Sequence, residues 1–255
     1  MSKLVDKLKQ ASEAGAAPIG FRSAAAPKQP TLALVAEVTL PLDMKEAALC
    51  LDAVMIKVTN ISKEVEDIKT LKSLSGDTPF GASVKNPSEK TMAQLKEAGA
   101  DFLVFKATEA AAASVLNDDI GKIVVADSSW RDINLRSLET LEVDGILAED
   151  NAEKPPLTVQ SLIDLRRFSM LSGKPLLVRL SFIPSEKELS ALVRIQARGL
   201  VIPVKSDKDL ADLTKLRSVI DNLPRPKAKK PSISPLVPSV SPRADETESE
   251  EEEEE

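Results

Sequence analysis

Histidine and tyrosine are missing from this 255-residue chain, and cysteine and tryptophan occur once each. Without imidazole the chain has no Ser-His-Asp triad, no histidine general base and none of the common histidine-containing zinc sites. Proton transfer has to come from Asp, Glu, Lys, Cys50 or water, because no phenol is present either. A single cysteine forms no internal disulfide, and this favours a reducing compartment.

Long apolar runs are also missing. The first ten residues, MSKLVDKLKQ, carry charges throughout, and no stretch has the length of a signal peptide or a membrane span. We therefore expect a cytoplasmic protein without a membrane partner. The body of the chain has no basic helix and no aromatic residues spaced for base stacking, so we expect no nucleic-acid partner.

Acidic charge is concentrated at the carboxyl end. Residues 224–255 hold five basic and nine acidic side chains, a net charge of −4 within a total of −6. A Pro/Ser/Lys-rich linker and a glutamate run bury too little apolar surface to offset the entropy of ordering. We expect a disordered, solubilising tail; contact with a basic partner and imitation of nucleic-acid charge are the alternatives.

Between residues 32 and 222 the chain alternates short apolar runs with helix-patterned stretches, eight times over. The apolar runs are residues 32–38, 53–58, 79–84, 102–106, 122–127, 145–150, 176–181 and 199–204. Helical patterns follow them at residues 43–51, 62–74, 88–98, 109–116, 130–141, 158–171, 186–197 and 207–223. This alternation predicts a closed parallel (β/α)8 or TIM barrel, and the length suits one such domain.

The predicted organisation has three parts. Residues 1–31 form an amino-terminal helix and capping segment, with Leu4, Val5 and Leu8 on one helix face as a lid on the barrel. Residues 32–223 form the barrel, and residues 224–255 form the disordered tail. Any site of a TIM barrel is expected at the carboxyl ends of its strands.

Period-two alternation places Glu37 on the same strand face as Ala33 and Val35. A charge is tolerated at the mouth of the barrel lumen and not against apolar helices, so Glu37 is predicted to point inward. The same reasoning directs Lys57, Lys85, Arg179 and Lys205 to the mouth, and Lys106, Asp127, Glu149 and Asp150 reach it from the rim. Clustered cations favour a carboxylate or phosphate ligand.

Each candidate has a predicted role. Lys57 and Lys106 are candidates for Schiff-base formation, because apolar walls and neighbouring cations disfavour an ammonium. The other predicted catalytic residues are Glu37 and Asp127. The predicted ligand-binding residues are Lys85, Arg179, Lys205 and Ser206, the last at the start of a helix.

Two alternatives stay open. Asp127, Glu149 and Asp150 supply oxygen ligands for a possible Mg²⁺, and no other cofactor is expected. Glu37 and Lys57 can instead simply neutralise one another. In that interpretation the barrel is a non-catalytic scaffold that binds an anion or a protein.

The strand-turn pieces AGADFLVFKATE and EVDGILAED resemble strand entries of aldolase-type TIM barrels, over residues 32–223. Within them, VFKATE resembles the strand-end lysine of Schiff-base aldolases, although no glycine-rich turn follows it here. The resemblance implies an aldolase-type lyase with Lys106 as the reactive amine, and the clustered cations predict that its ligand is a small anionic metabolite.

Removal of residues 226–255 is expected to leave the melting temperature of the barrel nearly unchanged, because this segment offers little apolar surface to the core. Thermal unfolding of the full and shortened chains, followed by circular dichroism, measures the difference. A fall of many degrees would show that the tail docks on the barrel.

Overall fold

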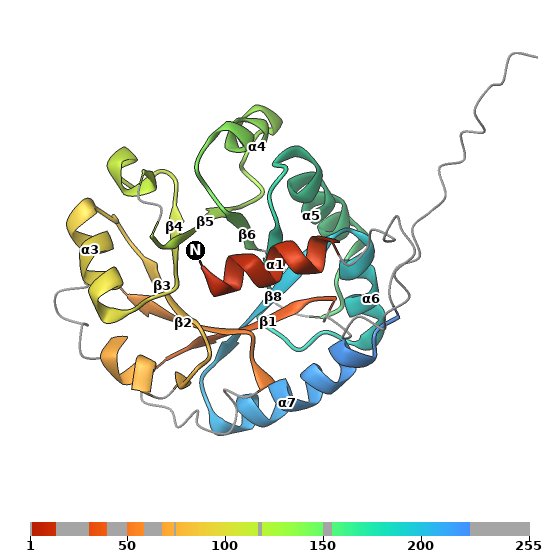
Figure 1. Ribbon diagram of the computed structural model, residues 1–255. Helices are drawn as coiled ribbons and strands as arrows, with labels where there is room; N and C mark the ends of the chain where they lie inside the picture. Colours follow the sequence, from red (N-terminus) through yellow and green to blue (C-terminus); the bar gives the residue numbers. More distant parts are fainter. Residues whose placement is uncertain are drawn as a thin grey trace, which may run out of the picture.

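The computed structural model describes residues 2–13, 31–39, 50–58, 68–73, 75–116, 119–149 and 155–224. Within them, eight parallel strands form a closed barrel in sequence order (Figure 1). The strands are β1 (Ala33–Val38), β2 (Ala53–Val58), β3 (Phe80–Val84), β4 (Phe102–Lys106), β5 (Gly121–Ala126), β6 (Gly145–Glu149), β7 (Leu176–Arg179) and β8 (Ala197–Val204). Both the predicted fold and the predicted strand order are confirmed.

Pairing of β1 with β8 closes the barrel. Its register runs from Ala33 opposite Gly199 to Val38 opposite Val204. Because these strands are parallel and far apart in the chain, their pairing depends on the crossover segments between them. The expected closure is therefore present.

The described helices begin and end largely as their caps predict. They are α1 (Lys3–Glu13), α3 (Glu89–Ala98), α4 (Asp132–Ser137), α5 (Val159–Leu171), α6 (Glu186–Arg194) and α7 (Asp207–Asn222), with 3-10 turns η2 (Ala112–Val115) and η3 (Leu138–Thr140). The hydroxyls of Ser88, Ser185 and Ser206 accept N–H groups of the first turns, and Gly99 ends α3 with φ 81°. The helical patterns at 43–51 and 62–74 lie mostly outside the described residues, as does the segment 225–255.

Two predicted helices are wrong in type or length. Residues 109–116 form only the 3-10 turn η2, and residues 130–141 form the six-residue α4 followed by η3. The residues at their starts, Ala111 and Arg131, provide no side-chain cap. A short uncapped segment gains too few hydrogen bonds to offset the cost of helix nucleation.

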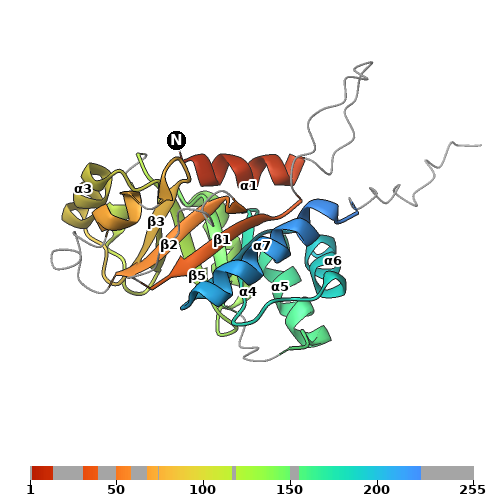
Figure 2. The same ribbon diagram turned by 90° about the horizontal axis from the view of Figure 1, so that it is seen from below.

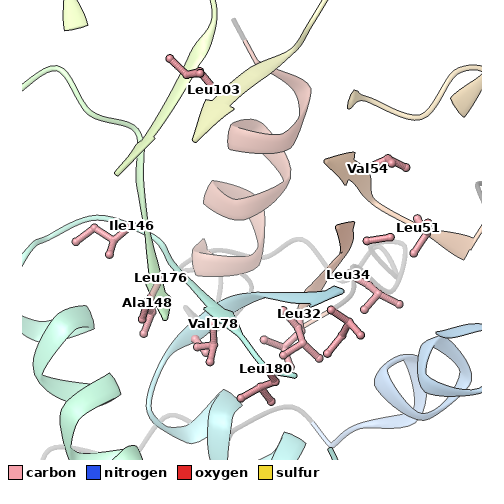
Figure 3. Close-up of a cluster of buried hydrophobic side chains, with 14 of the residues drawn as sticks. Leu32, Leu34, Leu51, Val54, Leu103, Ile146, Ala148, Leu176, Val178 and Leu180 are labelled. Atoms are coloured by element: carbon pink, nitrogen blue, oxygen red, sulfur yellow. The ribbon is translucent and has the colours of Figure 1, made fainter. Parts of the chain in front are cut away.

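Two apolar layers result from the alternation of side chains along the strands. Figure 3 shows part of the outer layer, in which side chains such as Leu34, Val54 and Ile146 point away from the lumen. The inner layer fills the lumen and consists of Ala33, Val35, Ala53, Met55, Phe102, Val104, Ile123, Val125, Leu147, Leu177 and Val201 together with Leu4 and Leu8 of α1.

Helix α1 covers the amino-terminal end of the barrel, as the sequence predicts (Figures 1 and 2). Leu4 and Leu8 are completely buried in the inner layer. The helix start is held by the Asp101 carboxylate, which accepts hydrogen bonds from Ser2 Oγ and from the N–H groups of Lys3 and Leu4 at 2.7 to 3.0 Å. The lid is thus fixed by apolar contact and by a charged cap.

Asp52 joins three further elements at the same end. Its Oδ2 accepts the N–H of Leu34 at 2.9 Å and Nη1 of Arg217 from α7 at 2.6 Å, and its Oδ1 pairs with Nζ of Lys7 from α1 at 3.1 Å. This buried carboxylate is neutralised by two cations, so its burial is tolerated.

Replacement Gly81→Ala is expected to lower the free energy of unfolding by about 1–3 kcal/mol, the usual effect of overpacking. A Cβ at Gly81 lies only 2.5 Å from ring carbons of Phe102, which is buried in the lumen. Denaturant titration of the purified variant measures the loss.

Gly145→Ala is the matched control on β6. Its Cβ meets nothing closer than the Pro175 carbonyl oxygen at 3.4 Å, so its effect is expected within about 1 kcal/mol. The double variant Gly81→Ala/Phe102→Leu relieves the contact and is expected to show coupling between the two positions. Equal effects of the two alanine variants would contradict the proposed close packing.

Candidate functional site

The candidate site lies at the carboxyl ends of the strands, where the βα segments leave the barrel. Of these, residues 40–49, 59–67 and 150–154 are outside the described part. The described part of the site consists of the last inward-facing residues of the strands and of the segments that follow β3, β4, β5, β7 and β8.

Arg179, the last residue of β7, lies between two carboxylates. Its Nη2 is 2.7 Å from Oε2 of Glu37, and its Nη1 donates to Oε1 of Glu149 at 2.9 Å. Lys57 adds a weaker ion pair, with Nζ 3.5 Å from Oε1 of Glu37. The side chain of Glu37 is 7% exposed, whereas that of Lys57 is 64% exposed.

The strand register explains this network. Glu149 and Arg179 are direct partners on β6 and β7, and both point inward with Leu147 and Leu177. Glu37 extends the inward face of β1 and reaches Arg179 across the mouth. Within the described residues no aligned hydrogen bond reaches the buried Glu37 Oε2, so its attraction to Arg179 is mainly electrostatic.

The network is electrically neutral. Two cations, Arg179 and Lys57, face two carboxylates, Glu37 and Glu149. Because a buried carboxylate is costly without a partner, Arg179 offsets the burial of Glu37. Arg179 is therefore engaged by the protein's own carboxylates in this structure.

Three lysines at the rim differ from this network. The ammonium groups of Lys85, Lys106 and Lys205 are exposed and make no hydrogen bond or ion pair with any other residue in the described ranges. They are therefore available to an anion, and the charge of Lys106 acts on the carboxylate of Asp127.

Asp127 is held by the turn that follows β5. Ser129 donates to its Oδ1 through the hydroxyl at 2.5 Å and through the N–H at 2.9 Å. The hydroxyl bond from Ser129 is the main cause that holds the pKa of Asp127 below its ordinary value. Burial opposes it, and the N–H bond from Ser129 and then the charge of Lys106 add smaller lowering effects. Asp127 is thus ionised at neutral pH and serves as an acceptor and counter-ion.

Ser206 has a structural partner. Its hydroxyl accepts the N–H of Asp209, while Oδ2 of Asp209 accepts the N–H groups of Lys205 and Ser206, each at 3.0 Å. These bonds, the one from Lys205 first, hold the pKa of Asp209 below its ordinary value. The position that a phosphate takes at a helix start is therefore filled by the chain's own carboxylate.

The proposed magnesium ligands are only partly described. Asp127 is bonded to Ser129, Glu149 is bonded to Arg179, and Asp150 lies outside the described residues. No group of three or more acidic, cysteine or histidine side chains suited to a metal occurs in the described ranges. The magnesium site stays a prediction that depends on Asp150.

Two interactions at the site were not predicted from the sequence. The pairing of Arg179 with Glu149 depends on the β6–β7 register, which alternation alone does not reveal. The bond from Ser129 to Asp127 had a local signal, since Asp-Ser-Ser is a typical Asx-turn sequence. The other predicted residues that the structure describes lie at the mouth or rim.

This arrangement is that of a (β/α)8 or TIM barrel. Three solved variants of the tryptophan synthase α-subunit from the hyperthermophile Pyrococcus furiosus share the fold, with TM-scores of 0.55, 0.55 and 0.53 and sequence identities of 13%, 12% and 12%. Each alignment covers 75% of this chain and 97% of the other. No family model and no curated protein matches the sequence.

In the described part of the chain, no helix is both long and apolar enough to cross a bilayer.

Replacement Arg179→Met is expected to lower the free energy of unfolding by about 3 kcal/mol, because among the described residues it leaves the buried Glu37 with the exposed Lys57, 3.5 Å away, as its partner. Urea titration of the variant at neutral pH measures this loss. Arg136→Met, at an exposed position of α4, is the matched control and is expected to change stability by less than about 0.5 kcal/mol.

The double variant Glu37→Gln/Arg179→Met tests whether the unpaired charge of Glu37 causes the loss of stability in Arg179→Met. Neutralising the buried carboxylate is expected to recover part of the stability lost in Arg179→Met, giving a coupling energy of about 1–3 kcal/mol. Additive losses in the two single variants would contradict the ion pair as the source of the effect.

Proposed function

We propose that this barrel binds a small anionic metabolite, a carboxylate or a phosphate ester, at the carboxyl ends of its strands. We further propose that Lys57 and Lys106 are the amines for Schiff-base, lyase-type chemistry on that ligand. The single cysteine favours the cytoplasm as its location.

The observation that carries this proposal is the division of charge at the mouth. Glu37 and Glu149 are matched by Arg179 and Lys57, so the network contributes no net charge. Among the described rim residues, Lys85, Lys106 and Lys205 then face the carboxylates of Asp127 and Asp209, a net charge of +1 from three cations and two carboxylates. A net positive rim attracts an anion and favours its binding.

The position of the amines supports the chemistry. Lys57 and Lys106 continue the inward faces of β2 and β4, so both reach the lumen mouth where a bound ligand is expected. The amine attacks a ligand carbonyl, and loss of water leaves an imine. Asp127, ionised and bonded to Ser129, is the described carboxylate that can accept a proton near Lys106.

A second candidate function rests on the same network. Arg179 is bonded to the protein's own carboxylates, as expected of a mouth closed by mutual ion pairs. In this alternative the barrel is a non-catalytic scaffold, and the lysines of its rim bind an anion without forming a covalent bond.

Borohydride trapping with a panel of anionic carbonyl metabolites separates the two functions. Reduction of the imine leaves a secondary amine, so the modified peptide gains the mass of the metabolite less one oxygen atom. Mass spectrometry of digested protein is expected to place this modification on Lys106 or Lys57.

Lys106→Arg and Lys57→Arg keep the charge of the rim and remove the reactive amine, so one of them is expected to abolish trapping. Lys90→Arg, on the exposed side of α3, is the matched control and should trap normally. Trapping spread evenly over surface lysines, or none with any metabolite, would exclude the covalent chemistry and leave the scaffold function.

A further inference from the structure

A second group of cations lies at the opposite end of the barrel, beside α1. There a cavity of about 530 Å³ is bounded by α1, by the segments that lead into β6 and β7, and by the start of β8. Lys9, Lys174 and Arg198 line it, and Asp144 is the carboxylate among its lining residues. A cavity of this volume is of the size that holds a small ligand.

The backbone at the start of β8 is irregular where it lines this cavity. Leu176 pairs with Ala197 and Leu177 pairs with Gly199, so Arg198 is the extra residue of a β-bulge and has no partner on β7. Gln196, two residues earlier, has φ 67°, a left-handed conformation that is uncommon outside glycine. The bulge directs Arg198 toward the cavity.

The sequence suggested a different end for the preceding helix. The sequence pattern predicts that this helix extends to residue 197, but α6 ends at Arg194. Gly199 lies inside β8, where a Cβ would approach Leu177 and Leu8 to 3.0 and 3.1 Å. Gly199 is thus closely packed within the strand, and the irregular backbone lies just before it, at residues 195–198.

Arg198 has no counter-charge of its own. It is half-buried, and its guanidinium makes no hydrogen bond or ion pair with another residue in the part of the chain that the structure describes. Burial, and next the nearby charge of Arg166, lower the pKa of Arg198 from its ordinary value. An arginine remains charged nonetheless, so this position carries an uncompensated positive charge.

Lys9 and Lys174 add positive charge and hydrogen-bond donors to the cavity. Lys9 is exposed and makes no described bond, and Lys174 donates one hydrogen to the Leu141 carbonyl at 3.1 Å, leaving its other two free for a ligand. One carboxylate oxygen of Asp144 is engaged within the protein, because its Oδ2 accepts a hydrogen bond from the N–H of Lys122 at 2.9 Å. Three cations and one carboxylate give the cavity lining a net charge of +2.

We propose that this cavity is a binding site for a small phosphate-bearing anion, held by Arg198, Lys9 and Lys174. Arg198 is suited to grip two phosphate oxygens with parallel N–H bonds, and the lysines supply point charges from two sides. The site is separate from the rim lysines, because it lies at the amino-terminal ends of the strands. It does not depend on the function proposed for the mouth.

Titration of inorganic phosphate and pyrophosphate into the full chain at constant ionic strength tests this site. Isothermal calorimetry and the unfolding temperature are the two readouts. Arg198→Met is expected to weaken binding about tenfold or more, as loss of a hydrogen bond to a charged group does. Without phosphate, the same variant is expected to unfold at the same or a higher temperature, because repulsion from Arg166 is removed.

Arg194→Met, on the exposed side of α6, removes the same charge outside the cavity and is expected to keep the affinity within about twofold. Lys106→Met removes a rim lysine and is expected to keep the phosphate binding that Arg198→Met loses. Lys9→Met changes only an exposed side chain of α1, so it reports on the site even if Arg198→Met folds poorly, and a several-fold loss is expected.

Three binding results would overturn the proposal. They are absence of phosphate and pyrophosphate binding by the unchanged chain, equal losses in Arg194→Met and Arg198→Met, and binding that disappears in Lys106→Met but survives in Arg198→Met. The last result would place the anion at the mouth only. A lower unfolding temperature for Arg198→Met with unchanged affinity would likewise give Arg198 a structural role.

Discussion

Pairing of β1 with β8 is the constraint on which the rest of the structure depends. The two strands are joined from Ala33–Gly199 to Val38–Val204, and this pairing turns an open sheet into a ring without edges. Once the ring is closed, each strand has one side chain in two facing the lumen and one facing the helices. The apolar lumen, the outer layer and the inward direction of Glu37, Glu149 and Arg179 follow from that division.

The two ends of the lumen are closed by different interactions. At the amino-terminal end, Leu4 and Leu8 of α1 extend the apolar filling, and Asp101 and Asp52 fix the helix through hydrogen bonds and ion pairs. At the carboxyl-terminal end, Arg179 links Glu37 to Glu149. Apolar closure excludes water, whereas ionic closure lies next to solvent and keeps charged groups at the mouth, where we propose that a ligand binds.

Positive charge is divided between groups that stabilise the fold and groups left for a ligand. Arg179 and Arg217 are engaged by internal carboxylates, which accounts for the burial of Glu37 and Asp52. The rim lysines and Arg198 have no such described partners. This difference, rather than the total number of cations, locates the two proposed anion sites at opposite ends of one barrel.

The sequence by itself determined the barrel, the strands, the principal caps and the inward direction of Glu37, because these follow from local periodicity and from capping residues such as Ser88 and Ser185. Tertiary structure decided the double pairing of Arg179 and the bulge at Arg198, since both depend on the register between strands distant in the chain. It also reduced one helix pattern to a 3-10 turn and another to a six-residue helix followed by a 3-10 turn. Local patterns specify which face a residue occupies, but only packing across the barrel specifies what it touches.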